Sequence, residues 1–221
     1  MSAVNNEQAL VDGPAGAIDV LVDAPESPRG IALVAHPHPL FGGANTNKVA
    51  HTLARTLRDL GYAAIRPNFR GVGKTAGTHD NGKGETEDML AVLAWGQQRF
   101  GFTASDPVII AGFSFGAYVQ ARVAHQLADA GTPAERLVLV GTAAGHVEGA
   151  RQYDTAAVGK DAIVIHGSKD ETVALDNVLA WAEPLELPVI VVPGADHFFH
   201  GRLHILRDII TQRFNFSEAT A

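Results

Sequence analysis

Short apolar runs recur along the chain, and longer amphipathic stretches separate them. Runs such as V-I-I-A at 108–111 and L-V-L-V at 137–140 are continuously apolar and rich in β-branched residues. This composition is typical of strands that are buried on both faces of a parallel sheet. We predict strands at residues 17–23, 31–36, 62–68, 107–113, 136–142, 161–166 and 188–193.

The stretches between these runs have helical periodicity. In segment 84–100 the apolar residues form one broad stripe, and acidic residues occupy the first turn, where a helix favours negative charge. Alternating strands and helices with short connections predict an α/β sandwich of three layers around a mostly parallel sheet. We predict helices at 45–60, 84–100, 115–130, 174–184 and 201–214.

Two longer segments lack a clear period. Residues 71–84 are rich in glycine and are predicted to form one long surface loop, and residues 144–160 form the other irregular piece. The second segment is too short to fold into a cap domain. Because no linker or repeat interrupts the pattern, we expect residues 1–221 to form a single domain.

Composition and charge narrow the possible functions. The 221 residues include no cysteine, which excludes disulfides, thiolate metal sites and cysteine nucleophiles. The net charge of −7 and the lack of a basic block make nucleic acids and anionic membranes poor partners. The N-terminal residues do not resemble a signal peptide, and no apolar run is long enough to span a membrane. We therefore expect a cytoplasmic protein.

The motif G-F-S-F-G at 112–116 indicates a nucleophile. A predicted strand precedes it and a predicted helix follows it, which is the context in which G-x-S-x-G forms a sharp turn that exposes its serine. The flanking glycines leave room in the crowded turn. We therefore expect Ser114 to be the nucleophile of a serine hydrolase with an α/β-hydrolase fold.

A serine nucleophile needs a base, and the base needs an orienting carboxylate. In this fold the acid and then the histidine follow the serine along the chain, in loops after later strands. Asp170 and His197 occupy such loops and are the expected acid and base. The competing residues are Asp196, Glu171 and Asp176 for the acid, and His200 and His166 for the base.

The loop after the strand at 31–36 should supply one backbone N–H to the oxyanion hole, and Phe115 should supply the other. Pro37 and Pro39 have no N–H, so the first donor is His38 or, as the alternative, Leu40. We prefer His38 from its position in the turn.

Metal and nucleotide chemistry are weaker alternatives. The pairs His36/His38 and His200/His204 have spacings compatible with zinc, but neither forms an H-E-x-x-H motif, so we predict no metal site. The sequence G-V-G-K-T at 71–75 looks like the end of a phosphate-binding loop. Asn68 stands where that motif requires glycine, and no helical pattern follows the lysine.

Taken together, the motifs resemble the small capless bacterial α/β hydrolases, close to the dienelactone hydrolase-like and acyl-peptidase-like groups. The resemblance covers about residues 16–215 and implies Ser114 as nucleophile, Asp170 as acid, His197 as base and no cofactor. Dienelactone hydrolases proper use a cysteine nucleophile, which this chain lacks, so a general carboxylesterase is the expected activity. The motifs are H-P-H-P-L-F-G-G at 36–43, N-K-V at 47–49, N-F-R-G-V-G-K-T-A-G at 68–77, G-F-S-F-G-A-Y at 112–118, H-G-S-K-D at 166–170 and D-H-F-F-H at 196–200.

Apolar side chains flank the expected catalytic positions and could line a pocket for a small-molecule ester. A thioesterase, an amidase or peptidase with the same triad, and a non-catalytic binding protein on the same fold are the alternatives. The residues expected at the pocket are Leu40, Phe41, Phe113, Phe115, Phe198 and Phe199.

Overall fold

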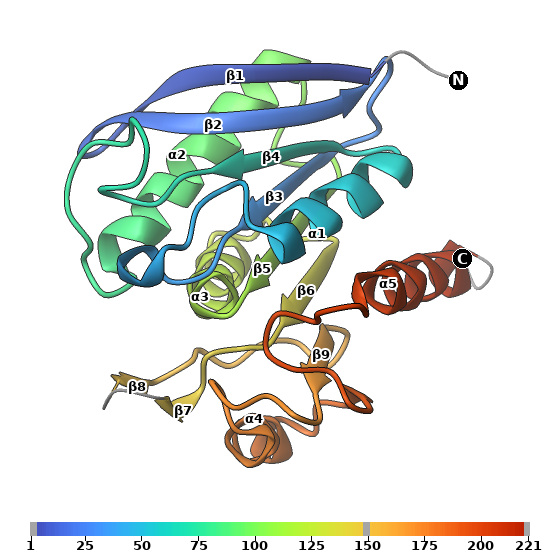
Figure 1. Ribbon diagram of the computed structural model, residues 1–221. Helices are drawn as coiled ribbons and strands as arrows, with labels where there is room; N and C mark the ends of the chain where they lie inside the picture. The colour runs from blue at the N-terminus through green and yellow to red at the C-terminus, as the bar shows by residue number, and fades with distance from the viewer. Residues whose placement is uncertain (1–3, 148–150, 219–221) are drawn as a thin grey trace.

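The computed structural model describes residues 4–147 and 151–218 (Figure 1). It contains an eight-stranded sheet, a small two-stranded sheet, and helices packed on both faces of the large sheet. In chain order the elements are β1 (Val4–Gly13), β2 (Gly16–Pro25), β3 (Ile31–Ala35), η1 (Pro39–Phe41), α1 (Lys48–Asp59), β4 (Ala63–Pro67), α2 (Lys83–Phe100), β5 (Val108–Phe113), α3 (Phe115–Asp129), β6 (Arg136–Val140), β7 (Gly145–Val147), β8 (Arg151–Tyr153), β9 (Ile163–Gly167), α4 (Leu175–Ala182), η2 (Glu183–Leu185), β10 (Val189–Val192) and α5 (Leu203–Glu218).

The large sheet has the order β1-β2-β4-β3-β5-β6-β9-β10. Strands β1, β2 and β4 pair antiparallel at one edge, and the strands from β4 to β10 pair parallel. Strand β5 lies at the centre, where Ile110 pairs with Leu33 of β3 and Leu137 of β6. The carboxyl ends of β3, β5 and β9 therefore share one edge, where ligands bind in open α/β sheets.

Two hydrophobic layers hold the helices to the sheet. Helices α1 and α5 cover one face, and α2, α3 and α4 cover the other (Figure 1). Successive residues of the central strands alternate between the layers: Ile110 packs with α2 and α3, whereas Ile109 and Ala111 pack on the α1 side. This three-layer α/β-hydrolase arrangement confirms the predicted fold class.

Local sequence signals explain where the helices begin. Asn47 caps α1 because its Oδ1 accepts hydrogen bonds from the N–H groups of Val49 at 2.9 Å and Ala50 at 3.3 Å. At the start of α2, the carboxylate of Glu85 accepts a hydrogen bond from the Gly82 N–H at 2.9 Å, which satisfies a backbone group before the helix.

Three strands are absent from the prediction. Strand β1 pairs only with β2 at the sheet edge, and its residues 7–13 are mostly exposed. Its sequence has no clear apolar alternation. Strands β7 and β8 have three residues each and pair antiparallel within the segment expected to be irregular. Strands this short leave no period that sequence reasoning can detect.

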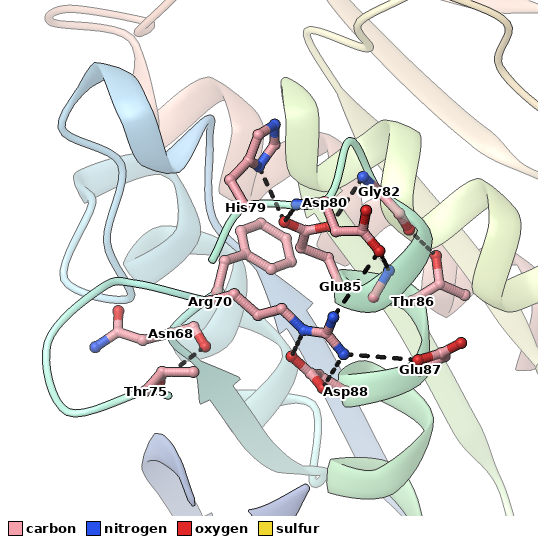
Figure 2. Close-up of polar contacts among 12 residues, drawn as sticks. Asn68, Arg70, Thr75, His79, Asp80, Gly82, Glu85, Thr86, Glu87 and Asp88 are labelled. Atoms are coloured by element: carbon pink, nitrogen blue, oxygen red, sulfur yellow. Dashed lines mark hydrogen bonds and ion pairs between the residues drawn. The ribbon is translucent and has the colours of Figure 1, made fainter. Parts of the chain in front are cut away.

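The glycine-rich loop before α2 is tied to the sheet rather than lying loosely on the surface. Thr75 is buried, and its hydroxyl accepts from the Asp19 N–H at 3.0 Å and donates to the Asn68 carbonyl at 3.1 Å, the second bond being drawn in Figure 2. Lys74 is followed by further loop, and α2 begins only at Lys83. This geometry differs from a phosphate-binding loop, whose lysine opens a helix.

Candidate active site

The nucleophile turn lies between the end of β5 and the start of α3, and Ser114 is the one residue between them. Ser114 has φ 58° and ψ −119°, a conformation that non-glycine residues rarely adopt. A hydrogen bond of 2.9 Å from its N–H to the Val140 carbonyl holds it there. Strain of this kind persists only where the surrounding structure enforces it.

The two glycines of the motif are required by close backbone approach. A Cβ on Gly116 would lie 2.5 Å from the carbonyl oxygens of Ala35 and His36, and one on Gly112 would lie 2.4 Å from the Gly116 carbonyl oxygen. Because backbone atoms cannot move aside cheaply, any side chain at either position would push α3 away from the sheet.

A continuous hydrogen-bonded chain connects the serine to a buried carboxylate. The Nε2 of His197 is 3.0 Å from Ser114 Oγ, and its Nδ1 is 2.7 Å from Asp170 Oδ2. In the neutral ring, Nδ1 therefore donates to the carboxylate and Nε2 accepts from the hydroxyl. The structure thus brings together the three residues that the chain order predicted, in the arrangement of a nucleophile, base and orienting acid.

Asp170 and His197 are each fixed from several sides. The other oxygen of Asp170 accepts from the N–H groups of Thr172 at 3.0 Å and Val173 at 2.8 Å, and its side chain is fully buried. The imidazole of His197 packs against Phe113 and Phe198, with ring centroids 4.9 Å and 5.1 Å away. This packing limits the ring to the orientation that reaches the serine.

Neither competing base takes the place of His197, although Nε2 of His166 lies 3.4 Å from Asp170 Oδ2, the oxygen that His197 contacts at 2.7 Å. The Nε2 of His166 is 3.0 Å from the Val173 carbonyl, and burial lowers the pKa of this histidine. His200 is exposed, and its Nδ1 is 2.7 Å from Asp196 Oδ2, so these two competitors pair with each other on the surface. Among the competing acids, Glu171 is exposed and Asp176 lies in the first turn of α4.

The histidine pairs considered as metal ligands have other roles or are exposed. Nε2 of His36 accepts from the Phe69 N–H at 2.9 Å, and its Nδ1 donates to the Pro37 carbonyl at 2.6 Å. Burial lowers the pKa of His36 to about 4, so the ring is neutral. His200 and His204 are exposed. Within residues 4–147 and 151–218, no group of three or more histidine, cysteine, aspartate or glutamate residues is arranged so that it could hold a metal ion.

Of the expected oxyanion donors, His38 lines the same cavity as Ser114, and Phe115 follows the serine in the chain at the start of α3. In the described part of the chain, no acceptor bonds the backbone N–H of either His38 or Phe115. The N–H of Leu40, the alternative donor, instead donates to Nδ1 of His38 at 3.3 Å. The geometry thus favours His38 over Leu40.

A cavity of about 230 Å³ opens next to Ser114. Two of the expected pocket residues, Phe41 and Phe198, line it, and both are partly exposed. The lining residues are Pro37, His38, Phe41, Gly42, Gly43, Asn47, Ser114, Arg151, Thr172, His197 and Phe198.

Four other residues expected at the pocket lie elsewhere. Phe113 points to the layer under α1 because it shares a strand face with Ile109 and Ala111, and Phe199 is buried in the same layer. Phe115 begins α3 on the opposite face and packs against Phe69, at 5.3 Å between ring centroids. Leu40 lies in η1 with 70% of its surface exposed and does not line the cavity.

Known proteins share this architecture over nearly the whole chain. A serine hydrolase without a lid, XC6422 from Xanthomonas campestris, is 35% identical, with a TM-score of 0.82 over 96% of this chain and 94% of that one. An uncharacterized protein of Rickettsia prowazekii is 34% identical over 203 residues, which span 87% of this chain and 82% of that protein. The chain belongs to the small α/β serine hydrolases without a lid.

Two further matches are partial or distant. The prolyl oligopeptidase family model matches residues 48–130, which include the nucleophile turn. Est1E from Butyrivibrio proteoclasticus, solved with ferulic acid bound, has a TM-score of 0.79 at 17% identity, over 96% of this chain and 100% of that one. At that identity the likeness shows the fold alone. In the described ranges of the hydrolase, no helix is long and apolar enough to cross a membrane.

Sequence reasoning did not identify two features near the serine. Arg151 lines the cavity from β8, a short strand that the sequence pattern does not reveal. His79 lies in the glycine-rich loop, with its ring 4.7 Å from His38 and 5.2 Å from Phe115 between centroids. The histidine thus packs against both residues whose N–H groups are the expected oxyanion donors.

A buried carboxylate lies beside the His79 ring. Nδ1 of His79 is 2.9 Å from Oε1 of Glu85, whose side chain is fully buried (Figure 2). The same carboxylate accepts from the N–H groups of Asp80 and Gly82, both at 2.9 Å. Glu85 thus anchors the loop that carries His79, at the start of α2.

We expect His79→Ala to reduce kcat about tenfold while KM changes little. Removing the ring takes one packing partner from the rings of His38 and Phe115, which loosens the oxyanion donors. The loss of one whole donor would cost about a hundredfold or more. Steady-state kinetics on a p-nitrophenyl ester measures the effect, with His125→Ala, an exposed change on α3, as the control. An unchanged kcat in His79→Ala would show that this packing has no role in positioning.

Proposed function

We propose that this serine hydrolase cleaves small carboxylic esters through an acyl-enzyme formed on Ser114. The observation that carries the proposal is the unbroken chain of hydrogen bonds from Ser114 through His197 to the buried Asp170. A hydroxyl becomes a competent nucleophile when such a base takes its proton. Pro37, Phe41 and Phe198 give the adjoining cavity an apolar wall, against which an acyl or alcohol group can pack.

Each step of the reaction follows from these contacts. Nε2 of His197 takes the hydroxyl proton as Ser114 Oγ bonds to the ester carbonyl carbon, and the N–H groups of His38 and Phe115 stabilise the resulting oxyanion. The protonated His197 then donates to the leaving alcohol as the C–O bond breaks. In deacylation, His197 takes a proton from water as the hydroxide attacks the acyl carbon. The protonated His197 then gives that proton to Ser114 Oγ as the bond to the acyl carbon breaks and the carboxylic acid leaves.

Asp170 does not exchange protons in this scheme. Its Oδ2 keeps the proton of the neutral ring on Nδ1, so that Nε2 faces the serine as an acceptor. When the ring becomes charged, the fixed carboxylate stabilises it. No step requires a cofactor.

An amidase or peptidase is the second candidate, and the match of residues 48–130 to the prolyl oligopeptidase family model favours it. The same triad cleaves amides, whose leaving group is poorer. Matched p-nitrophenyl ester, thioester and p-nitroanilide substrates with one acyl group separate the activities. The proposal expects the ester to react far faster than the anilide, whereas comparable rates would favour the peptidase.

Two histidine–aspartate pairs among the described residues have the same separation, and we expect only one to matter for catalysis. Nδ1 and Oδ2 are 2.7 Å apart both in His197–Asp170 and in His200–Asp196. Asp170→Asn should lower kcat by about two to four orders of magnitude, because the amide no longer sets the tautomer of the ring. Asp196→Asn, the matched control, should leave kcat within about twofold of wild type.

Both variants should fold, and circular dichroism with thermal unfolding checks this before the kinetics. If Asp196→Asn lost most of its activity while Asp170→Asn stayed nearly as active as wild type, the catalytic acid would be Asp196 and our assignment would be wrong.

Acyl-chain length gives a further prediction. The cavity beside Ser114 is small, and each methylene contributes about 0.8 kcal/mol only while it is buried. We expect kcat/KM for p-nitrophenyl esters to peak at acyl chains of roughly two to six carbons. Because the family lacks a lid, the rate should show no jump when the substrate forms micelles. A peak at long chains, or such a jump, would contradict this picture of the pocket.

A further inference from the structure

A second histidine lies against the carboxylate of the triad. His166 is the fourth residue of β9, and Asp170 lies in the loop that follows this strand. Nε2 of His166 is 3.4 Å from Asp170 Oδ2, the same oxygen that lies 2.7 Å from Nδ1 of His197. The side chains of His166 and Asp170 are both fully buried. One carboxylate oxygen thus faces two imidazole rings, and the proposed reaction uses only one of them.

The same nitrogen of His166 closes the loop that carries the acid, residues 167–173. Nε2 is 3.0 Å from the Val173 carbonyl, and a carbonyl oxygen only accepts, so Nε2 carries the hydrogen. The N–H of Val173 in turn donates to Asp170 Oδ1 at 2.8 Å. His166 therefore ties the end of the loop back to the strand, and the loop end holds the carboxylate.

The other ring nitrogen of His166 has no partner. Its Nδ1 is buried, and no hydrogen-bonding group among the described residues reaches it. Because burial lowers the pKa of His166, the ring is neutral at neutral pH and Nδ1 carries no hydrogen. A buried polar atom without a partner has a free-energy cost that an apolar side chain would avoid. The contacts of Nε2 are therefore what distinguishes histidine from an apolar residue at this position.

We propose that His166 is a positioning residue for the reaction, which holds residues 167–173 closed and presents a ring N–H to Asp170 Oδ2 while that oxygen orients His197. The assignment rests on the proposed function, because His166 acts through the triad. His166 is not among the described residues that line the cavity beside Ser114. It should therefore affect the rate of the chemical steps and leave substrate binding unchanged.

Two substitutions of similar size test this role. Glutamine and methionine have side chains of similar length, but only the glutamine amide can donate to the Val173 carbonyl. We expect His166→Met to lower kcat about tenfold with KM within about twofold of wild type, and His166→Gln to keep kcat within about threefold. Steady-state kinetics on p-nitrophenyl acetate measures both. An unchanged kcat in His166→Met, or equal losses in the two variants, would overturn the assignment.

The stability of the variants is expected to change little. His166→Met removes the unpartnered Nδ1 but also takes the hydrogen-bond donor from the Val173 carbonyl, so the two effects offset. Thermal unfolding followed by circular dichroism should give a Tm within about 4 °C of wild type. If His166→Met does not fold, His166→Asn replaces it in the comparison, because its shorter side chain cannot bring the amide to the Val173 carbonyl.

The pH profile of kcat/KM separates positioning from a merely structural role. A ring N–H that faces Asp170 Oδ2 compensates part of the carboxylate charge, so without it the Asp170–His197 pair should take up a proton more readily. His166→Met should therefore move the acid limb of the profile to higher pH by about half a unit or more, and His166→Gln by less than half of that shift. A structural defect alone would lower the profile without moving its acid limb, and that result would overturn the assignment.

The other ionisable groups near the pair are the same in wild type and in both variants, so their effects cancel in this comparison. In the described part of the chain, His166 and His197 are the titratable groups within 4 Å of the Asp170 carboxylate. The groups farther away are Lys169 and Glu171 beside Asp170 in the chain, His38 and Arg151 in the cavity wall, and Asp196 with His200 on the surface. His125→Met, the same substitution at an exposed position of α3, should leave the profile unchanged.

Labelling of Ser114 by a fluorophosphonate separates this inference from the proposed function, because it requires an activated serine but no ester. The second-order rate constant for labelling should fall about tenfold in His166→Met, with the same shift of the acid limb, and stay near the wild-type value in His166→Gln. If the wild type is labelled but cleaves no ester, the esterase proposal fails and the labelling rates still decide the role of His166. Identical labelling profiles in wild type and His166→Met would overturn that role, whether or not esters are cleaved.

Discussion

The geometry of the active site depends on how closely α3 approaches the ends of β3 and β5. Gly116 lies against the carbonyls of Ala35 and His36, and Gly112 lies against Gly116 itself, at separations that leave no space for a side chain. This contact forces the chain to turn within a single residue. Ser114 occupies that residue in a strained conformation, where its hydroxyl lies at the sheet edge and the following N–H groups begin a helix.

Surroundings, rather than separation alone, distinguish the histidine that we assign to catalysis. His197–Asp170 and His200–Asp196 have the same spacing, but the first pair is buried, packed by two phenylalanines and bonded to two backbone N–H groups. The oxyanion loop is supported in a similar way. His36 bonds to the backbone of Phe69, which joins the loop after β3 to the loop after β4. Neutral His36 can accept that bond because burial holds its pKa at about 4.

The sequence predicts the parts of this structure that local patterns encode. Continuous apolar runs predicted the central strands, and the G-x-S-x-G motif with chain order predicted that Ser114, Asp170 and His197 would meet. The pocket could not be predicted in the same way. Phe113 and Phe198 are both aromatic neighbours of expected catalytic residues, but strand alternation turns Phe113 into the core while Phe198 reaches the cavity. Arg151 enters the site through a short strand whose position depends on tertiary packing.

The central claim is that the turn and its hydrogen-bonded partners activate one serine. Reaction with a fluorophosphonate probe, followed by intact-mass and peptide-mapping spectra, tests it most directly, since only an activated serine is phosphonylated rapidly. We predict one adduct per wild-type chain, on the peptide that contains Ser114, no adduct in Ser114→Ala, and unchanged labelling in Asp196→Asn. Labelling that persists in a folded Ser114→Ala variant would contradict the account.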